Sequence, residues 1–141
     1  MESSYGGIAV PIPADGPYEY WDANRLDGRG LLSMKHVAVQ AGLGTLGKNT
    51  LFLNESYGNR LTLGCVLTNI VVDSDSYAEP LCLPNCNACV TNCSSGALHE
   101  GSVSQRECRM KAYGKTKRGF DTVDCNRCRT VCHMRFGACV V

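Results

Sequence analysis

Between residues 33 and 42, the apolar positions recur at intervals of three and four, which is the pattern of an amphipathic helix. The apolar stripe consists of Met34, Val37, Ala38 and Ala41. Ser33 stands where a helix N-cap is expected, and Gly42 stands where a helix commonly ends. The pattern therefore predicts one short helix that presents a single apolar face.

The other apolar segments before residue 73 are typical of strands. Residues 7–13 are apolar and contain two prolines, which favours a short edge strand. Residues 50–53 indicate a second short strand, residues 54–59 a turn, and residues 61–72, rich in Leu, Val, Ile and Thr, a buried strand. Because Cys65 lies in this last run, we expect it to be a small buried hydrophobic residue. The first half thus has an α/β pattern.

A polar connector, DSDSYAEP at residues 73–80, separates this half from a region dense in cysteine. The chain has 141 residues, enough for one compact domain or for a small domain beside part of another. We therefore predict a boundary near residue 79, with one unit at residues 1–78 and a second at residues 79–141. The fold class that this organisation indicates is α+β.

Ten cysteines give the chain its most informative pattern, and two stretches repeat each other. They are CNACVTNC, from Cys86 to Cys93, and CNRCRTVC, from Cys125 to Cys132. In two-cluster ferredoxins the last cysteine of such a run binds the other cluster. The spacing predicts one [4Fe-4S] cluster on Cys82, Cys86, Cys89 and Cys132. It predicts a second on Cys93, Cys108, Cys125 and Cys128. The segment before Cys108 is expected to form a hairpin that turns at Glu100 and Gly101.

Two other uses of the cysteines stay open at this point. The pairs Cys86/Cys89 and Cys125/Cys128 could together form a four-thiolate zinc site, which would leave four regularly spaced thiols unused. Disulfides are the other alternative, but no signal segment is visible, so a reducing cytoplasmic compartment is expected. The longest apolar run is too short to span a bilayer, and no membrane partner is expected. Cys139 in the C-terminal tail is predicted to be a free thiol.

Positive charge is concentrated at the end of the chain. Residues 1–103 hold 5 Lys and Arg against 10 Asp and Glu, whereas residues 104–141 hold 9 against 3. These cations can offset the negative charge of clusters ligated by thiolates. A nucleic-acid surface over residues 106–129 is the alternative interpretation, with Tyr113 and Phe120 as the aromatic residues in that region.

A glycine loop follows the predicted helix, and Gly42, Gly44 and Gly47 match the pattern GxGxxG. The nucleotide-binding version of this loop follows a strand, whereas a helix precedes it here, and Asn49 stands where a phosphate loop needs Ser or Thr. The glycines are therefore interpreted as positions where backbone closely approaches another element or a flat ligand. His36 and His133, beside this loop and Cys132, are interpreted as ordinary surface or capping residues.

The stretch HVAVQAGLGTLGKNTLFLNESYGNRLTLGCVLTNI, followed by the two cysteine motifs, resembles the epoxyqueuosine reductase family and its iron-sulfur paralogues. The resemblance runs from about residue 33 to residue 136. It implies a partial α/β corrinoid-type domain, followed by a ferredoxin-like module with two [4Fe-4S] clusters. It also implies that Gly42, Gly44, Gly47, Lys48 and Asn49 belong to a cobalamin-binding domain.

Several family features have no counterpart in this sequence. The family pattern has a proposed proton-donor aspartate shortly before the glycine loop, whereas LLSMKHVAVQ contains none, so no catalytic residue is assigned. About forty residues precede the loop, and the helical-repeat tail that grips transfer RNA is absent. We therefore expect an iron-sulfur redox protein that passes electrons to a corrinoid or another acceptor. The alternatives are an electron relay without its own catalysis and a zinc-binding RNA module. The expected partners are a ferredoxin- or flavodoxin-type protein, with tRNA as a further candidate.

Overall fold

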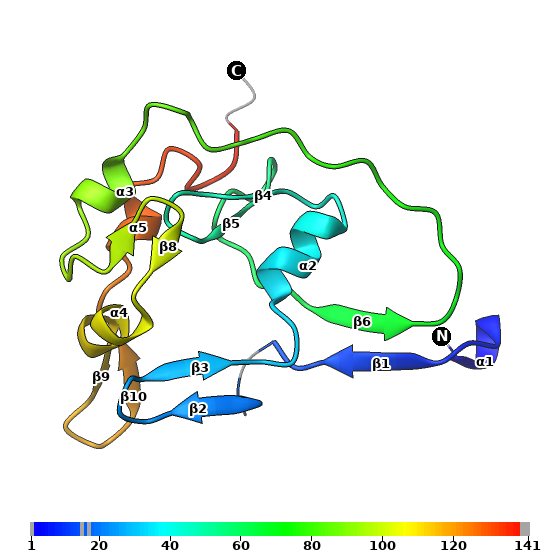
Figure 1. The fold of residues 1–141 in the computed structure, drawn as a ribbon, viewed down its shortest axis with the longest axis horizontal. Coiled ribbons are helices and arrows are strands. Elements are labelled where there is room, and N and C mark those ends of the chain that lie inside the picture. The colour runs from blue at the N-terminus through cyan, green and yellow to red at the C-terminus, as the bar shows by residue number, and fades with distance from the viewer. Residues whose placement is uncertain (1, 15, 17, 139–141) are drawn as a thin grey trace.

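A computed structural model describes residues 2–14, 16 and 18–138, which fold into a mixed arrangement of short helices and strands (Figure 1). The helices are α1 (Glu2–Tyr5), α2 (Met34–Gln40), α3 (Ala88–Thr91), α4 (Gln105–Ala112) and α5 (Arg127–Thr130). Within the described residues, every sheet is an antiparallel pair of strands. None of the helices described there is long and apolar enough to cross a membrane.

Five strand pairs complete the fold. The pairs are β1 (Ala9–Ile12) with β6 (Cys65–Thr68), β2 (Tyr20–Asp22) with β3 (Asp27–Arg29), β4 (Thr45–Leu46) with β5 (Phe52–Leu53), β7 (Leu98–His99) with β8 (Ser102–Val103), and β9 (Tyr113–Lys115) with β10 (Asp121–Val123). The β1–β6 pair lies on the opposite side of the molecule from α3, α4 and α5 (Figure 1). A long segment without helix or strand runs from β6 to α3 along the outside.

The predicted helix at residues 33–42 is confirmed as α2. Its N-cap, Ser33, has an extended backbone, and the Ser33 hydroxyl lies 2.7 Å from Nδ1 of His36. Ala38 on the predicted apolar stripe is buried. The helix ends before Gly42, whose φ of +73° is a conformation that favours glycine.

The prediction of a long buried strand at residues 61–72 is wrong. Only Cys65–Thr68 form a strand, and three of its four residues are exposed. It pairs with β1, in the register Ile12 opposite Cys65, and most residues of the two strands taken together are exposed. Val71 is 96% exposed, and Cys65 is half-buried rather than buried. The edge strand expected at residues 7–13 does form, as β1.

The turn predicted at residues 54–59 joins the two halves of the sequence. The Asn54 side chain accepts hydrogen bonds from the amides of Ser56 and Tyr57, and Asn54 pairs with Gly58. The Asn59 amide donates to the carbonyl of Met134 at 3.0 Å. Met134 is buried, and Leu53 in the adjacent β5 is completely buried. A small core therefore forms where β5 and this turn meet the C-terminal segment.

The short hairpin expected around Glu100 and Gly101 is confirmed as β7 and β8. Gly101 has a φ of +79°, and its amide donates to the carbonyl of Lys48 at 3.1 Å. The hairpin that precedes Cys108 thus also contacts the glycine loop. The proposed division at residue 79 stays a prediction, although backbone hydrogen bonds of this kind connect the two sides of it.

Candidate metal centres

The two repeated cysteine motifs adopt the same local structure. In each motif the first two cysteines flank the N-terminus of a four-residue helix, α3 in one case and α5 in the other. The residues at the two N-caps have similar backbones: Asn87 has φ −121° and ψ 16°, and Asn126 has φ −137° and ψ 25°. The two helices also pack against each other. Duplication in the sequence therefore becomes duplication in space.

The first cavity is lined by four cysteines, which are Cys82, Cys86, Cys89 and Cys132. These are the four predicted to hold one cluster, and Cys132 comes from the other motif. Residues 47–49 of the glycine loop complete the wall together with His133. Nε2 of His133 lies 3.2 Å from the carbonyl of Leu81, so a backbone contact positions this ring.

The second cavity has a volume of about 210 Å³ and is lined by Cys93, Cys108, Cys125 and Cys128. These are the other four predicted ligands, and Cys93 comes from the first motif. Cys108 reaches the cavity from α4. The structure therefore brings the eight cysteines together in two sets of four, each set crossing between the two motifs.

The zinc alternative needed Cys86, Cys89, Cys125 and Cys128 around one ion. The structure places the first pair at the first cavity and the second pair at the second cavity, which does not fit that site. Within residues 2–14, 16 and 18–138, no group of three or more His, Cys, Asp or Glu side chains is placed to hold a single metal ion. The nine cysteines described there are free rather than paired in disulfides. Cys139 lies outside the described residues.

The thiols around the cavities have different electrostatic environments. Burial raises the pKa of Cys89 and of Cys128, because a buried thiolate loses the stabilisation of water. Burial also raises the pKa of Cys108, and the neighbouring Cys93 and Cys125 add to that effect. Such thiols become ligands only when a positive centre offsets the charge of the thiolate.

The pKa values of two other thiols of the second cavity, Cys93 and Cys125, are lowered instead. Burial acts to raise the pKa of Cys93, but hydrogen bonds from the Ser95 hydroxyl and nearby backbone amides lower it overall. The backbone amide of Arg127 and then the Ser94 hydroxyl lower the pKa of Cys125. Each hydroxyl oxygen lies 3.5 Å from its sulfur. Hydrogen bonds to sulfur of this kind favour the thiolate form that binds metal.

Asn49 of the glycine loop lines both cavities. Its side chain is 3% exposed, and its Nδ2 donates to the carbonyl of Cys128 at 3.1 Å while its Oδ1 accepts from the amide of Leu51. Gly47 is close-packed against this side chain, since a Cβ at Gly47 would lie 2.7 Å from Oδ1 of Asn49. The loop is therefore part of the wall between the two cysteine sets, a role that local motif matching did not predict.

Lys48 connects the same loop to the segment before α3. Its Nζ forms an ion pair with Glu100 at 2.9 Å and donates to the carbonyl of Pro84. The hydrogen bond with Glu100 is the main cause that raises the pKa of Lys48, and the thiols of Cys82 and Cys86 act in the same direction. Lys48 thus provides positive charge beside the first cavity.

The other two predicted loop residues, Gly42 and Gly44, do not line either cysteine cavity. A Cβ at Gly42 would collide with the carbonyl oxygen of Ser76, and one at Gly44 would collide with the carbonyl oxygen of Leu53. Their requirement for glycine is explained by packing against the chain itself. Their assignment to a corrinoid stays a prediction.

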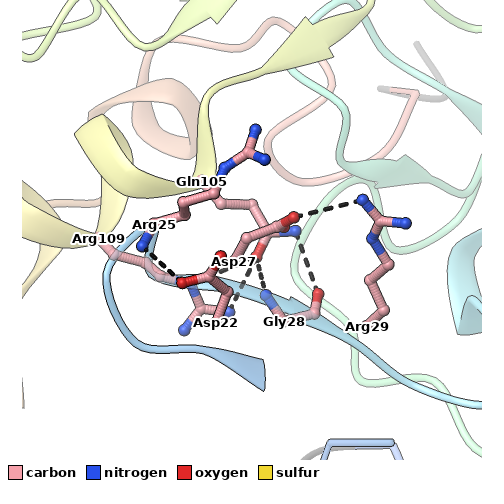
Figure 2. Close-up of polar contacts among 7 residues, drawn as sticks. All are labelled: Asp22, Arg25, Asp27, Gly28, Arg29, Gln105 and Arg109. Atoms are coloured by element: carbon pink, nitrogen blue, oxygen red, sulfur yellow. Dashed lines mark hydrogen bonds and ion pairs between the residues drawn. The ribbon is translucent and has the colours of Figure 1, made fainter. Parts of the chain in front are cut away.

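The β2–β3 hairpin contacts the helix that carries Cys108, as Figure 2 shows. Gln105 on α4 accepts a hydrogen bond from the amide of Gly28 at 3.2 Å and donates to its carbonyl at 3.1 Å. Arg109, one turn further along α4, donates to the hydroxyl of Tyr18 and lies over the rings of Tyr18 and Trp21. A bidentate amide pair and a cation–π contact therefore position the helix that brings Cys108 to the second cavity.

The chain was compared with known proteins. No family model matches it. An epoxyqueuosine reductase from Listeria monocytogenes is 38% identical over 111 residues, which cover 78% of this chain. An epoxyqueuosine reductase from Bacillus subtilis is 31% identical over 118 residues, which cover 77% of this chain. The chain is related to the epoxyqueuosine reductases. The resemblance inferred from the cysteine motifs and the glycine loop is thereby confirmed.

Solved structures of epoxyqueuosine reductases have the same fold as this chain. A selenomethionine-labelled epoxyqueuosine reductase matches 95% of the chain with a TM-score of 0.69 and 25% identity. Another epoxyqueuosine reductase, with a tRNA-Tyr epoxyqueuosine-modified stem loop, matches 95% with a TM-score of 0.66 and 23% identity. A third, from Streptococcus thermophilus, has a TM-score of 0.68 at 20% identity.

The matches cover only part of each epoxyqueuosine reductase. The chain spans 28% and 30% of the length of the two curated relatives, and about 35% of the first solved chain. Both cysteine cavities and the glycine loop lie within this chain. These elements, rather than the whole relatives, are the basis for a function of the chain.

Proposed function

We propose that this chain is an electron-transfer module of the epoxyqueuosine reductase type that holds two [4Fe-4S] clusters. The observation that supports the proposal is the division of eight cysteines into two cavities of four, with one cysteine exchanged between the motifs. A four-thiolate ligand set at each site is the set that [4Fe-4S] clusters require. Cys82, Cys86, Cys89 and Cys132 would hold the first cluster, and Cys93, Cys108, Cys125 and Cys128 the second.

The bound clusters would supply one-electron chemistry, since each can accept and release a single electron. The chain's own residues prepare the sites for the added negative charge. Lys48 lies beside the first cavity, whereas Arg109, Lys111 and Arg127 line the second. The exchanged cysteines, together with Asn49 between the cavities, hold the two sites adjacent, which favours rapid electron transfer from one to the other.

The electrons need an acceptor, and two versions of the module differ in what that acceptor is. In the enzyme version the chain reduces a corrinoid such as cobalamin beside residues 41–50, as part of chemistry on an epoxyqueuosine-containing tRNA. In the relay version a partner protein supplies the acceptor and its pocket. Both versions take electrons from a ferredoxin- or flavodoxin-type donor in a reducing cytoplasm, where the thiols stay available. The position of residues 47–49 at the first cavity makes the first site the expected exit to a corrinoid.

A reductive titration under strict exclusion of oxygen tests the proposal. The anaerobically purified chain should take up two electrons in two one-electron steps, each with the paramagnetic signal of a reduced [4Fe-4S] cluster. A protein that contains zinc and takes up no electrons would refute it. Mixing with cobalamin followed by gel filtration then separates the versions, because co-elution supports the enzyme version and loss of the cobalamin supports the relay version.

A further inference from the structure

A separate cavity of about 370 Å³ lies beside α5, and no cysteine is among the described residues that line it. Its volume falls in the range of roughly 300–1,000 Å³ that small-molecule sites occupy. The polar residues in its wall are Asn59, Arg60, Thr62, Asn126, Arg129, Thr130 and Arg135. They come from two distant segments, the turn after β5 and the C-terminal motif, so the cavity exists only in the folded chain.

The charged residues that line this cavity are all positive. Three arginines contribute to the wall, and none of the described lining residues is acidic. In the part of the chain that the structure describes, the ion pairs involve other cations, so none of Arg60, Arg129 and Arg135 has a carboxylate within 4.0 Å. Three guanidinium groups gathered without a counter-charge repel one another, and an anion between them would remove that cost.

The arginines are held in place before any ligand arrives. The Arg129 guanidinium donates to the carbonyl of Asn59, and Nδ2 of Asn59 donates to the carbonyl of Arg129 at 3.1 Å. Arg60 and Arg135 share one aromatic support, since their guanidinium carbons lie 5.1 and 4.7 Å from the centre of the Phe136 ring. Because these positions are fixed by the fold, less conformational freedom is lost when an anion binds.

Asn59 adds a second indication of a ligand. It is 1% exposed, and within the described residues its Oδ1 is a buried acceptor without a hydrogen-bond partner. Asn59 lines this cavity and also an adjoining cavity of about 260 Å³. A buried acceptor is costly when unpaired, so its presence in this wall calls for an explanation beyond packing.

The adjoining cavity is more apolar. It shares Asn59, Leu61, Thr62 and Arg129 with the arginine-lined cavity. Its wall continues along Met34 and Phe52. Lys35 lines this second part, and its pKa is lowered by burial and then by the nearby Arg129. A molecule that fills both parts would place an anionic group among the arginines and a less polar group toward α2.

We propose that the arginine-lined cavity is a binding site for the phosphate group of a phosphorylated organic molecule. Guanidinium groups form paired hydrogen bonds with phosphate oxygens, and three of them around one cavity can engage a tetrahedral anion from several sides. Thr62 and Thr130 supply hydroxyl groups at the same wall. This site does not depend on what the cysteines hold.

Binding of inorganic phosphate and of a nucleoside monophosphate to the anaerobically purified full chain tests the site, by calorimetry at constant ionic strength set with chloride. Saturable binding at one site is expected for both probes. Arg60→Gln and Arg135→Gln should each weaken it by roughly tenfold or more, because each removes a charge-assisted contact. The phosphate affinity of Arg60→Lys should lie between those of the original chain and of Arg60→Gln. Lysine keeps the positive charge but lacks the planar guanidinium group that forms paired hydrogen bonds.

The matched control is Arg118→Gln, which removes the same charge from an exposed arginine that does not line the cavity. It should leave phosphate affinity within about twofold of the original, because distant exposed charges are screened. An equal loss in Arg118→Gln and Arg60→Gln, or no saturable binding to the folded chain, overturns the proposal. A short single-stranded RNA is the third probe. If only the RNA binds and its binding depends on Arg60 and Arg135, the phosphate comes from a nucleic-acid backbone rather than from a free phosphomonoester.

Discussion

The two cysteine cavities are lined by the same number of cysteines but have different surroundings. The first is closed by the glycine loop and has Lys48 as the cation in its described wall. The second opens beside α4, and Arg109, Lys111 and Arg127 contribute to its wall. It also has hydroxyl groups of Ser94 and Ser95 within 3.5 Å of its sulfurs. A duplicated motif thus places four cysteines at each cavity, while the unrelated segments around it set the electrostatics.

The different surroundings of the two cavities predict which site has the higher reduction potential. A reduced cluster carries one more negative charge than an oxidised one, so neighbouring cations and hydrogen bonds to sulfur stabilise the reduced state. We therefore expect the second site to have the less negative reduction potential. Electrons would rest at the second site, and the first site, beside residues 47–49, would be the more strongly reducing one.

The largest effect is expected when a cysteine that one motif contributes to the other motif's cavity is removed. Cys132→Ala should lower the iron content from about eight to about four per chain. Its remaining spectrum should match that of Cys89→Ala, which belongs to the same cavity, and differ from that of Cys128→Ala. Iron analysis and electron paramagnetic resonance on anaerobic samples measure both properties.

Cys65→Ala is the control, because Cys65 lies in β6 and lines neither cavity. It should keep the full iron content. If Cys132→Ala instead resembles Cys128→Ala, each motif holds its own site and the crossed arrangement is wrong.

Asn49 lines both cavities, so replacing it should affect both sites. Asn49→Ala removes two hydrogen bonds from a buried side chain, which should lower the free energy of unfolding by about 2 kcal/mol and the Tm by roughly 5 °C. Both sites should lose iron at similar rates, since the side chain lines both. Thermal unfolding under nitrogen, with Asn24→Ala at an exposed turn as control, checks this result. Loss confined to one site would show that Asn49 supports only that site.

Lys111 tests the charge difference. Lys111→Gln should make the potential of the second site more negative, on the order of tens of millivolts, because it removes a positive charge that stabilises the reduced state. The first site should change less, since Lys111 lines only the second cavity. Redox titration followed by paramagnetic resonance separates the two potentials. Arg106→Gln, on the same helix but outside the cavity wall, should shift both less. An equal shift at both sites would contradict the local origin of the difference.

The smallest effect is expected at the hydroxyl beside Cys93. A thiolate has no proton to donate, so the Ser95 hydroxyl is the donor once Cys93 is a ligand. Ser95→Ala should therefore lower the potential of the second site by less than Lys111→Gln does. Ser102→Ala, at an exposed position on β8, is the matched control. A potential that rises in Ser95→Ala would reverse the assigned role.

Local patterns predicted the parts of the fold that depend on neighbouring residues. The helix after Ser33 and the turn at Gly101 follow from spacing and from backbone conformations that single residues prefer. The grouping of the cysteines around two cavities agrees with the spacing of the repeated motifs, and their role as cluster ligands stays a prediction.

The parts that failed depend on distant packing. Residues 61–72 have a strand-like composition, but composition does not reveal that β6 is short and that three of its four residues are exposed. The arginine cavity joins Arg60 to Arg129, which are far apart in sequence and meet through Asn59. The contact of Gln105 with Gly28 also joins residues that are far apart in the sequence. No local pattern in either segment signals such a contact.

Iron and acid-labile sulfide per folded chain, measured together with zinc after anaerobic purification or reconstitution, test the central claim most directly. Two four-thiolate sites predict about eight irons and eight sulfides with negligible zinc. A correctly folded chain that holds zinc and no sulfide, or that remains folded and iron-free after reconstitution, would contradict the account.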